Sequence, residues 1–537
     1  MSRLTPTKSY LVRAISLVTL LLSVHRVDAA EFFCSAGNVT CLIASINEAN
    51  TRGGVNTINL EPGSYALTSV DNVQQFGANG LPLIGSELTI NGVDAAMTII
   101  ERDSGAPPFR IFQIAENGSL SVNELTLRGG TLNPGGAILN DGTLTVSYSI
   151  IEGNQAQRGG AIFSRGSLSL AQTILARNSS MEGSGIENTG TAVLTSVSLV
   201  DNFATGAAGV SNFGTMTIQN STINDNVADG GGGILNRGMM EIKNTTVSDN
   251  RVRFFGGAGA LNFGTLKISN STITNNSSGG LGGNPVGSGA GVSNIAPGVV
   301  ELQNTIVALN RIISSTNPNA GPDCAGPITS LGNNIIGDLT GCDINLTAGD
   351  IVTDAGLGGF VDDGTPGGGH FSLLANSPAI DRGNDTACSA DPVLNTDQLG
   401  QTRAGPCDIG AIEFEGALTI VIDVRPWRDP NRINLKSNKQ VNVALLSGAG
   451  FDATLLDTST VRFGATGFEA APVHISRRDI NGDGQRDLVL RFRIQDLGLQ
   501  CGASDLKLTG LNPNGHPISG SSPILTTGCK QNEVAQS

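Results

Sequence analysis

The sequence predicts an all-β protein: a right-handed parallel β-helix of about ten coils with an N-terminal helical cap, followed by a C-terminal β-sandwich. The main observation is a repeat with a period of 24 residues, whose copies begin at Gly118, Gly142, Gly166, Gly190, Gly214 and Gly238. Within a copy, apolar residues alternate, as at Met216 and Ile218, which is the period of a strand with one buried face. Each copy is expected to give about three short strands. One copy cannot bury its inner face alone, so stacked copies are expected to share a continuous core.

Two columns of asparagine support the stacking. The first lies 12 residues after the repeat glycines and contains Asn154, Asn178, Asn202, Asn226, Asn250, Asn276 and Asn310. The second contains Asn140, Asn188, Asn212, Asn236, Asn262 and Asn294. Asparagine tolerates the left-handed turn conformation, and its amide can bond to the equivalent residue one coil away. A β-propeller would instead require blades of roughly 40–50 residues. The pattern therefore favours a β-helix.

Changes in composition along the chain predict five segments. Residues 1–30 resemble a signal peptide, because three basic residues precede the apolar run Ala14–Val24 and two small residues, Ala29 and Ala30. That run is too short to cross a bilayer, so we expect an exported mature chain with no transmembrane segment. The other expected segments are a cap over 31–56, the β-helix over 57–321, a cysteine-containing capping region over 322–416 and the β-sandwich over 417–537.

Cysteine and charge content narrow the functional class. The eight cysteines fall into four neighbouring pairs, Cys34/Cys41, Cys324/Cys342, Cys388/Cys407 and Cys501/Cys529. None forms C-x-x-C, which argues against zinc, and disulfides are the default in an exported protein. Pairing of neighbours is the simplest of the connectivities that the sequence allows. The chain carries 32 basic and 46 acidic side chains, a net charge of −14. Such a chain lacks the electrostatic footprint of a protein that binds nucleic acid or an anionic membrane.

The N-terminal segment predicts a helical cap. Thr40 is expected to N-cap a short amphipathic helix whose Leu42, Ile43 and Ile46 cover the open end of the first coil. A cap is needed because an uncovered β-helix exposes a pairing edge.

Three segments resemble known families. GGAI at Gly135–Ile138 and Gly159–Ile162, with I-x-x-N at Ile223–Asn226, resembles the polymorphic outer-membrane protein repeat, with an aliphatic residue in place of the family's Phe. Cys41-Leu42 and the following NTINLEPGSYAL resemble a CSLREA-type cap, with Ile43-Ala44 in place of Arg-Glu. Ser377–Asn384 and Asp397–Glu415 resemble the choice-of-anchor Q ending of secreted bacterial β-helix proteins. These resemblances imply a bacterial protein that is secreted or attached to the cell surface.

The C-terminal module contains a candidate calcium loop, DINGDGQRD. Positions 1, 3, 5 and 9 of the loop are Asp479, Asn481, Asp483 and Asp487, and the Gln485 carbonyl would supply position 7. It is not an EF-hand, because Leu490 replaces the glutamate of position 12 and strands flank the loop. It resembles the calcium loops of integrin-type and dockerin-like segments. Three carboxylates within nine residues would repel one another without a cation, so we expect calcium; the alternative is an acidic turn without metal.

A candidate ligand face lies on one edge of the rod. Asp201, Asp225 and Asp249 share one offset in successive coils, so their side chains should stack ~4.8 Å apart. Such a column suits calcium or a substrate, although aspartate is also a common turn former. The first enlarged loop of this edge adds Arg251, Arg253, Phe254 and Phe255, which suit sugar stacking or a protein partner. Alternatively, the two phenylalanines cover the glycine-rich insertion over 277–289.

No catalytic constellation is evident. The polygalacturonase-like set of N-x-D, D-D and H-G does not occur together, and Asp362-Asp363 lies outside the predicted coils. The four histidines are scattered, and G-x-S-x-G, P-loop and dinucleotide patterns are absent. The sequence therefore favours a secreted or cell-surface, non-catalytic scaffold or adhesin that contacts a polysaccharide or a surface protein. The alternative is a polysaccharide lyase or glycoside hydrolase built on the same rod.

Overall fold

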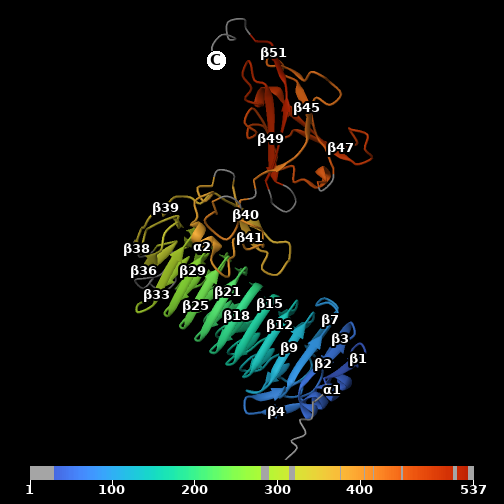
Figure 1. Ribbon diagram of the computed structural model, residues 1–537, viewed down its shortest axis with the longest axis vertical. Coiled ribbons are helices and arrows are strands. Elements are labelled where there is room, and N and C mark those ends of the chain that lie inside the picture. The colour runs from blue at the N-terminus through green and yellow to red at the C-terminus, as the bar shows by residue number, and fades with distance from the viewer. Residues whose placement is uncertain are drawn as a thin grey trace, which may run out of the picture.

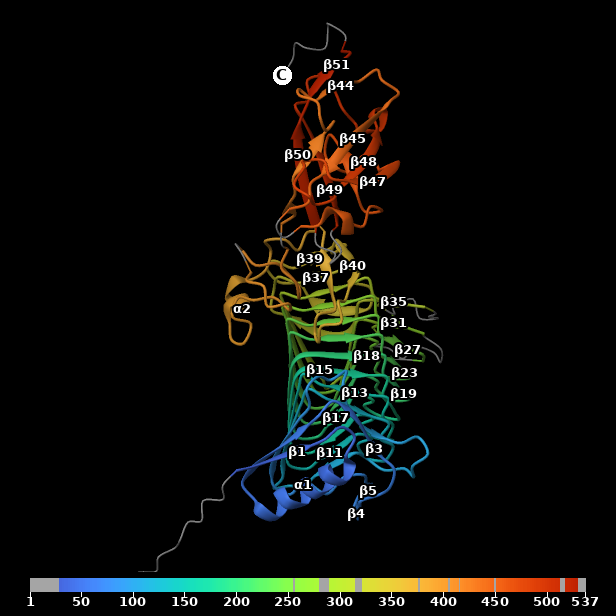
Figure 2. The same cartoon turned by 90° about the vertical axis from the view of Figure 1, so that its right-hand side faces the viewer.

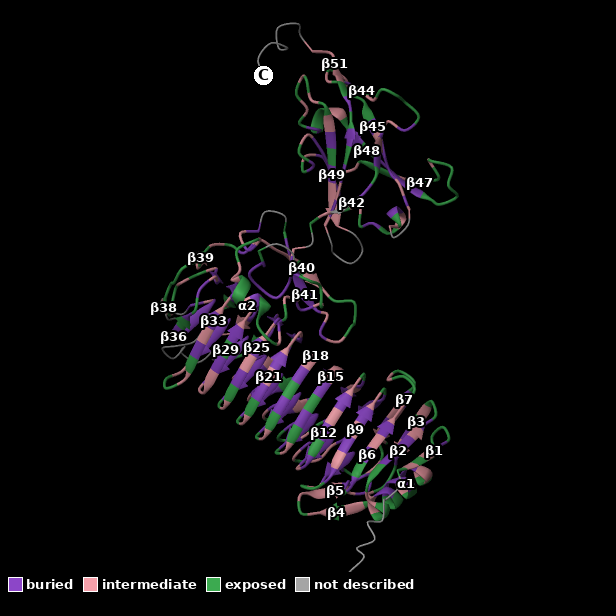
Figure 3. Ribbon diagram, in the orientation of Figure 1, coloured by how far each residue is buried: buried purple, intermediate pink, exposed green. Residues whose placement is uncertain are grey.

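The computed structural model describes residues 29–254, 256–279, 289–313, 321–374, 377–403, 406–414, 416–448, 451–511 and 517–529. Strands dominate it, and both predicted parts are present: a rod of stacked parallel strands and a C-terminal sandwich (Figure 1). Buried residues occur along the whole rod and through the sandwich (Figure 3). The predicted fold class is confirmed. Among the described residues, every helix is too short or too polar to cross a membrane.

The N-terminal cap consists of β1 (Ala30–Cys34) and α1 (Val39–Arg52). The helix buries Leu42 and Ile46 against the first coil, as expected. Its N-cap is Asn38 rather than the predicted Thr40: the Asn38 side chain accepts a hydrogen bond from the Cys41 amide at 3.0 Å. Asparagine caps a helix at least as well as threonine, so the helix begins as soon as the chain leaves the turn after β1.

The rod has four sides, each a ladder of parallel strands. The first side contains β2 (Val55–Leu60), β6 (Glu87–Asn91), β9 (Ser119–Asn123), β12 (Thr143–Ser147), β15 (Ser167–Ala176), β18 (Thr191–Val200), β21 (Thr215–Gln219), β25 (Met239–Lys243), β29 (Thr265–Ser269) and β33 (Val299–Gln303). The second side contains β3 (Gly63–Leu67), β7 (Thr98–Arg102), β10 (Thr126–Arg128), β13 (Ile150–Glu152), the ends of β15 and β18, β22 (Thr222–Asn224), β26 (Thr246–Ser248), β30 (Thr272–Thr274) and β34 (Ile306–Ala308).

The third side is a narrow ladder of two-residue strands: β16 (Ser179–Ser180), β19 (Phe203–Ala204), β23 (Val227–Ala228), β27 (Arg251–Val252), β31 (Ser277–Ser278) and β35 (Arg311–Ile312). The fourth side contains β8 (Phe112–Ile114), β11 (Ile138–Asn140), β14 (Ile162–Ser164), β17 (Ile186–Asn188), β20 (Val210–Asn212), β24 (Ile234–Asn236), β28 (Ala260–Asn262) and β32 (Val292–Asn294). A typical coil thus contributes four strands instead of the three expected, because a two-residue strand is too short to show alternation in sequence. A small hairpin, β4 (Asn72–Gln74) and β5 (Gly77–Asn79), projects near the cap.

Both asparagine columns form amide ladders inside the turns. In the first, each side-chain nitrogen donates to the next side-chain oxygen at 2.9–3.1 Å, and Asp323 accepts the last bond from Asn310 at 2.8 Å. The second forms such a ladder from Asn188 to Asn294 at 2.8–2.9 Å. The predicted member Asn140 does not join it, because its side chain donates to the Ser164 hydroxyl of the next coil at 2.9 Å. The left-handed residue of the first turn is not the ladder asparagine but the residue before it, as at Asp225 (φ 53°). That turn points the asparagine inward.

The pairing of the rod continues beyond the predicted boundary at residue 321. It extends through β36 (Cys324–Ser330), β37 (Ile335–Ile336), β38 (Cys342–Asn345) and β39 (Ile351–Val352). These last coils lose the 24-residue period, since β36 pairs with β38 at a spacing of only 16 residues, as Gly326 does with Cys342. The sequence pattern therefore does not reveal them.

Residues 357–414, hereafter the flap, lie along the second side of the rod instead of only closing its end (Figures 1 and 2). The flap contains β40 (Leu357–Val361), β41 (His370–Leu373) and α2 (Asp385–Ser389). Thr222 donates to the Gly369 carbonyl at 2.7 Å, and Thr246 donates to Gln398 at 2.7 Å. The strands β22, β26, β30 and β34 are therefore buried on both faces.

A buried charged centre holds the flap together. The Arg403 guanidinium is fully buried and donates to the carbonyls of Gly410 and Thr396 and to the Glu413 carboxylate at 2.9, 3.1 and 3.3 Å. The Asp397 carboxylate accepts backbone bonds from Leu399 and other residues of the flap. Burial raises the pKa of Asp397 and lowers that of Arg403.

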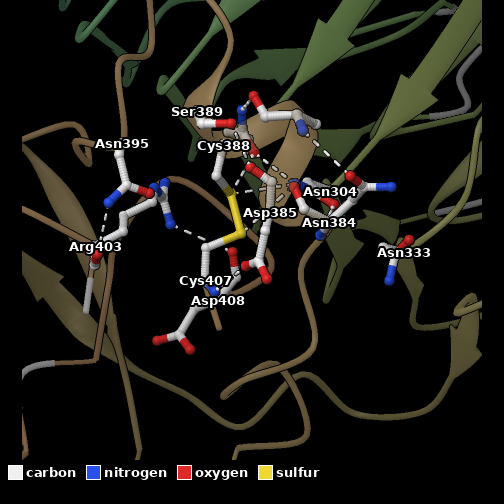
Figure 4. The surroundings of a disulfide bond; sticks show 12 residues. Asn304, Asn333, Asn384, Asp385, Cys388, Ser389, Asn395, Arg403, Cys407 and Asp408 are labelled. Atoms are coloured by element: carbon white, nitrogen blue, oxygen red, sulfur yellow. Dashed lines mark hydrogen bonds between the residues drawn. A yellow bond between two sulfur atoms is a disulfide. The ribbon is translucent and has the colours of Figure 1, made fainter. Parts of the chain in front are cut away.

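The Cys388–Cys407 disulfide lies beside this centre, next to Asn304 of the rod (Figure 4). The Asn304 amide lies 3.3 Å from the Cys388 sulfur, and its oxygen accepts a bond from the Asn384 amide at 2.7 Å. All four predicted cysteine pairs are disulfides, and no described cysteine is free. Two of them, Cys324–Cys342 and Cys388–Cys407, fasten the end of the rod and the flap.

The sandwich packs two four-stranded sheets. One contains β42 (Leu418–Thr419), β50 (Pro517–Pro523), β49 (Asp505–Leu511) and β46 (Arg462–Gly464); the other contains β43 (Ile422–Val424), β45 (Gln440–Leu445), β48 (Asp487–Arg493) and β47 (His474–Arg478). A separate pair, β44 (Arg432–Asn434) and β51 (Leu525–Thr527), lies at the end farthest from the rod (Figures 1 and 2). Phe463 and Phe492 meet in the core, with ring centroids 4.7 Å apart.

Candidate functional site

The short strands of the third side are stacked one on another along the rod (Figure 2). Their register places one outward side chain per coil in line. The outward residues are Ser179, Phe203, Val227, Arg251, Ser277 and Arg311. The second residue of each strand points inward, and Ala204, Ala228 and Val252 are fully buried. Because the strands pair in parallel, side chains that are about one coil apart in sequence lie ~4.8 Å apart in space.

Apolar and basic side chains gather on this side. Arg253 stacks over the Phe203 ring, with the guanidinium carbon 4.8 Å from the ring centroid, and lies 3.9 Å from Asp229. Phe254 is 42% exposed. The edge strip, as we call this surface, contains Met181, Phe203, Arg251, Arg253, Phe254 and Ile313, all of them exposed. Predicted residues Arg251, Arg253 and Phe254 lie in it, whereas Phe255 lies outside the described residues, as do most of 277–289.

The three predicted aspartates occupy the left-handed turn beside the edge strip. Asp201, Asp225 and Asp249 have φ of 55°, 53° and 53°, and Asn275 takes the same place in the following coil with φ 57°. Aspartate and asparagine are the residues that best tolerate this conformation after glycine. The left-handed backbone therefore explains why aspartate or asparagine occurs at this position. This favours the interpretation that the aspartates are turn formers and not a ligand column.

The carboxylates of this column nevertheless affect one another. Partial burial raises the pKa of Asp225, and the charge of Asp201 raises it further. Burial and the charge of Asp225 raise the pKa of Asp249 to about 6, against the opposing charge of Arg311. The column can therefore take up a proton near neutral pH. Arg177, which takes the same place one coil before Asp201, forms an ion pair with Glu152.

The candidate calcium loop is a self-bonded turn between β47 and β48. The Asp479 carboxylate accepts hydrogen bonds from the Gly482 and Gly484 amides at 2.7 and 3.0 Å. Gly482 has a φ of 80° and Gly484 a φ of 86°, both in the left-handed region that residues with side chains avoid. Backbone donation from Gln485 lowers the pKa of Asp483, whose other oxygen accepts a bond from the Asn481 amide at 2.9 Å.

Asp487 differs from the rest of the loop because it is fully buried. Its two oxygens accept the Ser447 and Ile480 amides at 2.8 and 2.7 Å, which ties the loop to the end of β45. Within the part of the chain that the structure describes, no three His, Cys, Asp or Glu side chains converge on one point as metal ligands would. Calcium binding by this loop stays a prediction.

The sequence analysis missed a cavity of about 380 Å³ between the flap and the rod. Gln172 and Ser196 line it from the rod, and Asp362, Asp363 and His370 line it from the flap. The two aspartates come after the repeated coils in sequence, but the flap folds back along the rod and places them beside Gln172 and Ser196. Both are turn formers: Asp362 accepts the Gly364 amide at 2.8 Å, and Asp363 accepts the Thr365 amide at 2.9 Å.

This cavity offers little acid–base chemistry. Hydrogen bonds from Thr365 lower the pKa of Asp363, which keeps it ionised and makes it a poor proton donor. One His370 ring nitrogen lies 2.8 Å from the Gly368 carbonyl and the other 3.3 Å from the Ser372 hydroxyl, so both contact the flap itself.

Comparison with known protein families found no family that matches the chain, and no curated protein searched is similar to it. The geometry therefore carries the functional argument.

Proposed function

We propose that this protein is a secreted or cell-surface β-helix scaffold that binds a polysaccharide along its edge strip without cleaving it. The observation that carries the proposal is the edge strip itself, where exposed phenylalanines and arginines lie on a ladder with a fixed repeat. The four disulfides support an oxidising, extracellular compartment.

The chemistry of the edge strip suits sugars. Aromatic rings stack on the apolar faces of sugar rings, and arginine donates several hydrogen bonds to hydroxyl or acidic groups. A protein partner would use the same residue types, since aromatic residues and arginine are enriched at interface hot spots. We place polysaccharide first because the strip is long and narrow, only about two residues wide in each coil.

One observation favours the enzymatic alternative. Asp225 and Asp249 are stacked carboxylates, and the pKa of Asp249 is about 6, as a general acid of a glycoside hydrolase requires. Their left-handed turn explains them without catalysis, so we rank hydrolysis or elimination second.

The edge strip can be tested on a glycan array with the full-length mature protein. The Arg253→Gln/Phe254→Ala variant should lose most of its glycan signal while its melting temperature is unchanged, because both side chains are exposed. Phe468→Ala is the matched control, since Phe468 is a 65% exposed phenylalanine of the sandwich. Equal binding by the double variant and the wild type would remove the edge strip from consideration.

We also propose that the loop of Asp479, Asn481, Asp483, Gln485 and Asp487 binds Ca²⁺. The donor set supports this, since three carboxylates, one amide and one carbonyl supply only oxygen, which calcium prefers. Calorimetry on the full-length chain should show a site that disappears in Asp483→Ala, a change at an exposed residue. Asp457→Ala, in another exposed turn, should keep it. No heat at millimolar calcium would contradict the proposal.

A further inference from the structure

A second cavity, of about 370 Å³, lies in the sandwich where β45 begins. Its floor is apolar, from the buried Ile433 and Val441. Its rim is polar, and the lining residues include Arg425, Trp427, Arg428, Arg432, Asn434, Ser437, Lys439, Gln440 and Asn442. The volume falls within the range of small-molecule sites, roughly 300–1,000 Å³. β48 spans the sheet from the calcium loop to this end, so the two features lie about 20 Å apart.

The charge of this cavity is opposite to that of the chain. Among the described residues, four cationic side chains and no acidic one line it, although acidic residues outnumber basic ones 46 to 32 in the whole chain. No ion pair between described residues involves Arg425, Arg428, Arg432 or Lys439. The positive surface continues onto the same sheet, where Arg491 and Arg493 are exposed opposite Asn442 and Gln440. Unpaired cations on one concave surface attract an anion.

Trp427 is held out at the rim of this cavity. It is the only tryptophan of the chain and is 64% exposed. Its φ is 74°, and that of Arg425 is 59°, while Pro426 between them is buried. A bulky residue in the left-handed region is strained, and such strain gathers at ligand-binding segments. Backbone bonds fix the turn, from the Arg425 amide to Asn442 at 2.8 Å and from the Arg428 amide to Arg425 at 3.0 Å.

We propose that this cavity, the Trp427 site, binds an acidic polysaccharide through its carboxylate or sulfate groups. The flat indole would stack on a sugar ring, the arginines would pair with the acidic groups, and Asn434, Gln440 and Asn442 would bond to hydroxyls. A phospholipid surface fits less well, because Trp427 is the only large apolar side chain exposed on the rim. Nucleic acid fits less well because the net charge of the chain is −14. The Trp427 site is independent of the edge strip.

The emission of Trp427 reports on this cavity alone, since the full-length chain has no second tryptophan. We would titrate the mature protein with oligogalacturonate, with a heparin oligosaccharide and with methyl-esterified oligogalacturonate, which keeps the sugar ring but lacks the charge. A saturable change in emission is expected with one or both acidic sugars, which separates carboxylate from sulfate recognition. The methyl ester should bind at least ~10-fold more weakly, because charge-assisted bonds are lost.

Matched variants complete the test. Arg428→Gln/Arg432→Gln keeps the tryptophan and should weaken the binding at least ~10-fold with an unchanged melting temperature. Lys507→Gln, an exposed cation on the other sheet, should have no effect, and neither should Arg253→Gln/Phe254→Ala in the edge strip. The proposal is overturned if no acidic sugar changes the emission at millimolar concentration, if the methyl ester binds equally well, or if single-stranded DNA binds more tightly than either acidic sugar.

Discussion

The rod and the sandwich are both disulfide-bonded β-structures, but their chemistry differs. The rod with its flap, residues 31–416, carries 15 basic and 34 acidic side chains, whereas residues 417–537 carry 13 basic and 11 acidic ones. The rod buries aliphatic residues and columns of asparagine amides, repeated coil after coil. The sandwich buries an irregular core around the Phe463–Phe492 contact.

The difference indicates where ligand-binding surfaces arise. In the rod, the strands of successive coils pair in the same register. Outward side chains are therefore aligned along the rod, as in the edge strip. In the sandwich, loops converge at the ends of strands and create a cavity, the Trp427 site. Under the two proposals above, the rod binds a long ligand along the edge strip, and the sandwich binds a few sugar units at the Trp427 site.

The largest expected effect concerns the repetitive core of the rod. Ile218 is fully buried, so Ile218→Asp places a charge without a partner in the stack and should cost about 4 kcal/mol or more of unfolding free energy. Secretion of soluble protein should fail. Thr217→Asp, one residue away on the outward face of β21, should be tolerated. Normal secretion and melting of Ile218→Asp would contradict the β-helix core.

The flap should depend on its charged centre. Arg403→Met leaves Glu413 and Asp397 buried without their cation, which should cost about 3–5 kcal/mol. The loss should be local, so limited proteolysis should cut within 357–414 while the rod persists. Arg382→Met, an exposed arginine of the same flap, is the control. Proteolysis patterns identical to wild type would show that the flap does not need Arg403.

The asparagine ladder should contribute somewhat less. In Asn226→Ala, the carbonyls of Leu199 and Asn224 and the amides of Asn202 lose a buried partner, which should cost about 3 kcal/mol. Gln219→Ala, which loses one half-exposed bond to Thr195, should cost under about 1 kcal/mol. Chemical denaturation of both variants measures the difference in unfolding free energy. Equal unfolding free energies would show that the ladder adds no stability of its own.

The smallest expected effect is a pH dependence of the aspartate column. Because the pKa of Asp249 is raised to about 6 in the folded chain, its contribution to stability is full below pH 4 and falls as the pH rises through 6. Asp249 is half-buried, so solvent screening reduces the expected change in unfolding free energy to about 1 kcal/mol. Asp249→Asn copies Asn275 of the next coil and should stabilise the protein by that amount at pH 7 but not at pH 3.5. A gain of equal size at both pH values would contradict the coupling.

Much of the rod could be predicted from its period. Ile218, the asparagine columns and the disulfide pairs follow from residues that recur or neighbour each other in sequence. The flap could not be predicted in place, because contacts such as Thr222 with Gly369 join segments almost 150 residues apart and follow no repeat. The same holds for the Trp427 site, whose residues come from two strands, two turns and the short helix that begins at Ile494. Asn38 was missed as a cap because Thr40 fits the same pattern.

We propose that this protein binds polysaccharides without cleaving them, and acidic ones at the Trp427 site. The most direct measurement incubates the mature protein with polygalacturonate, alginate and glycosaminoglycans and follows, in the same samples, binding and the release of new reducing or unsaturated chain ends. We expect saturable binding to at least one of these polymers, with no new chain ends even after prolonged incubation at pH 5 to 8. New chain ends that disappear in Asp249→Asn would contradict it and would identify the aspartate column as a catalytic site.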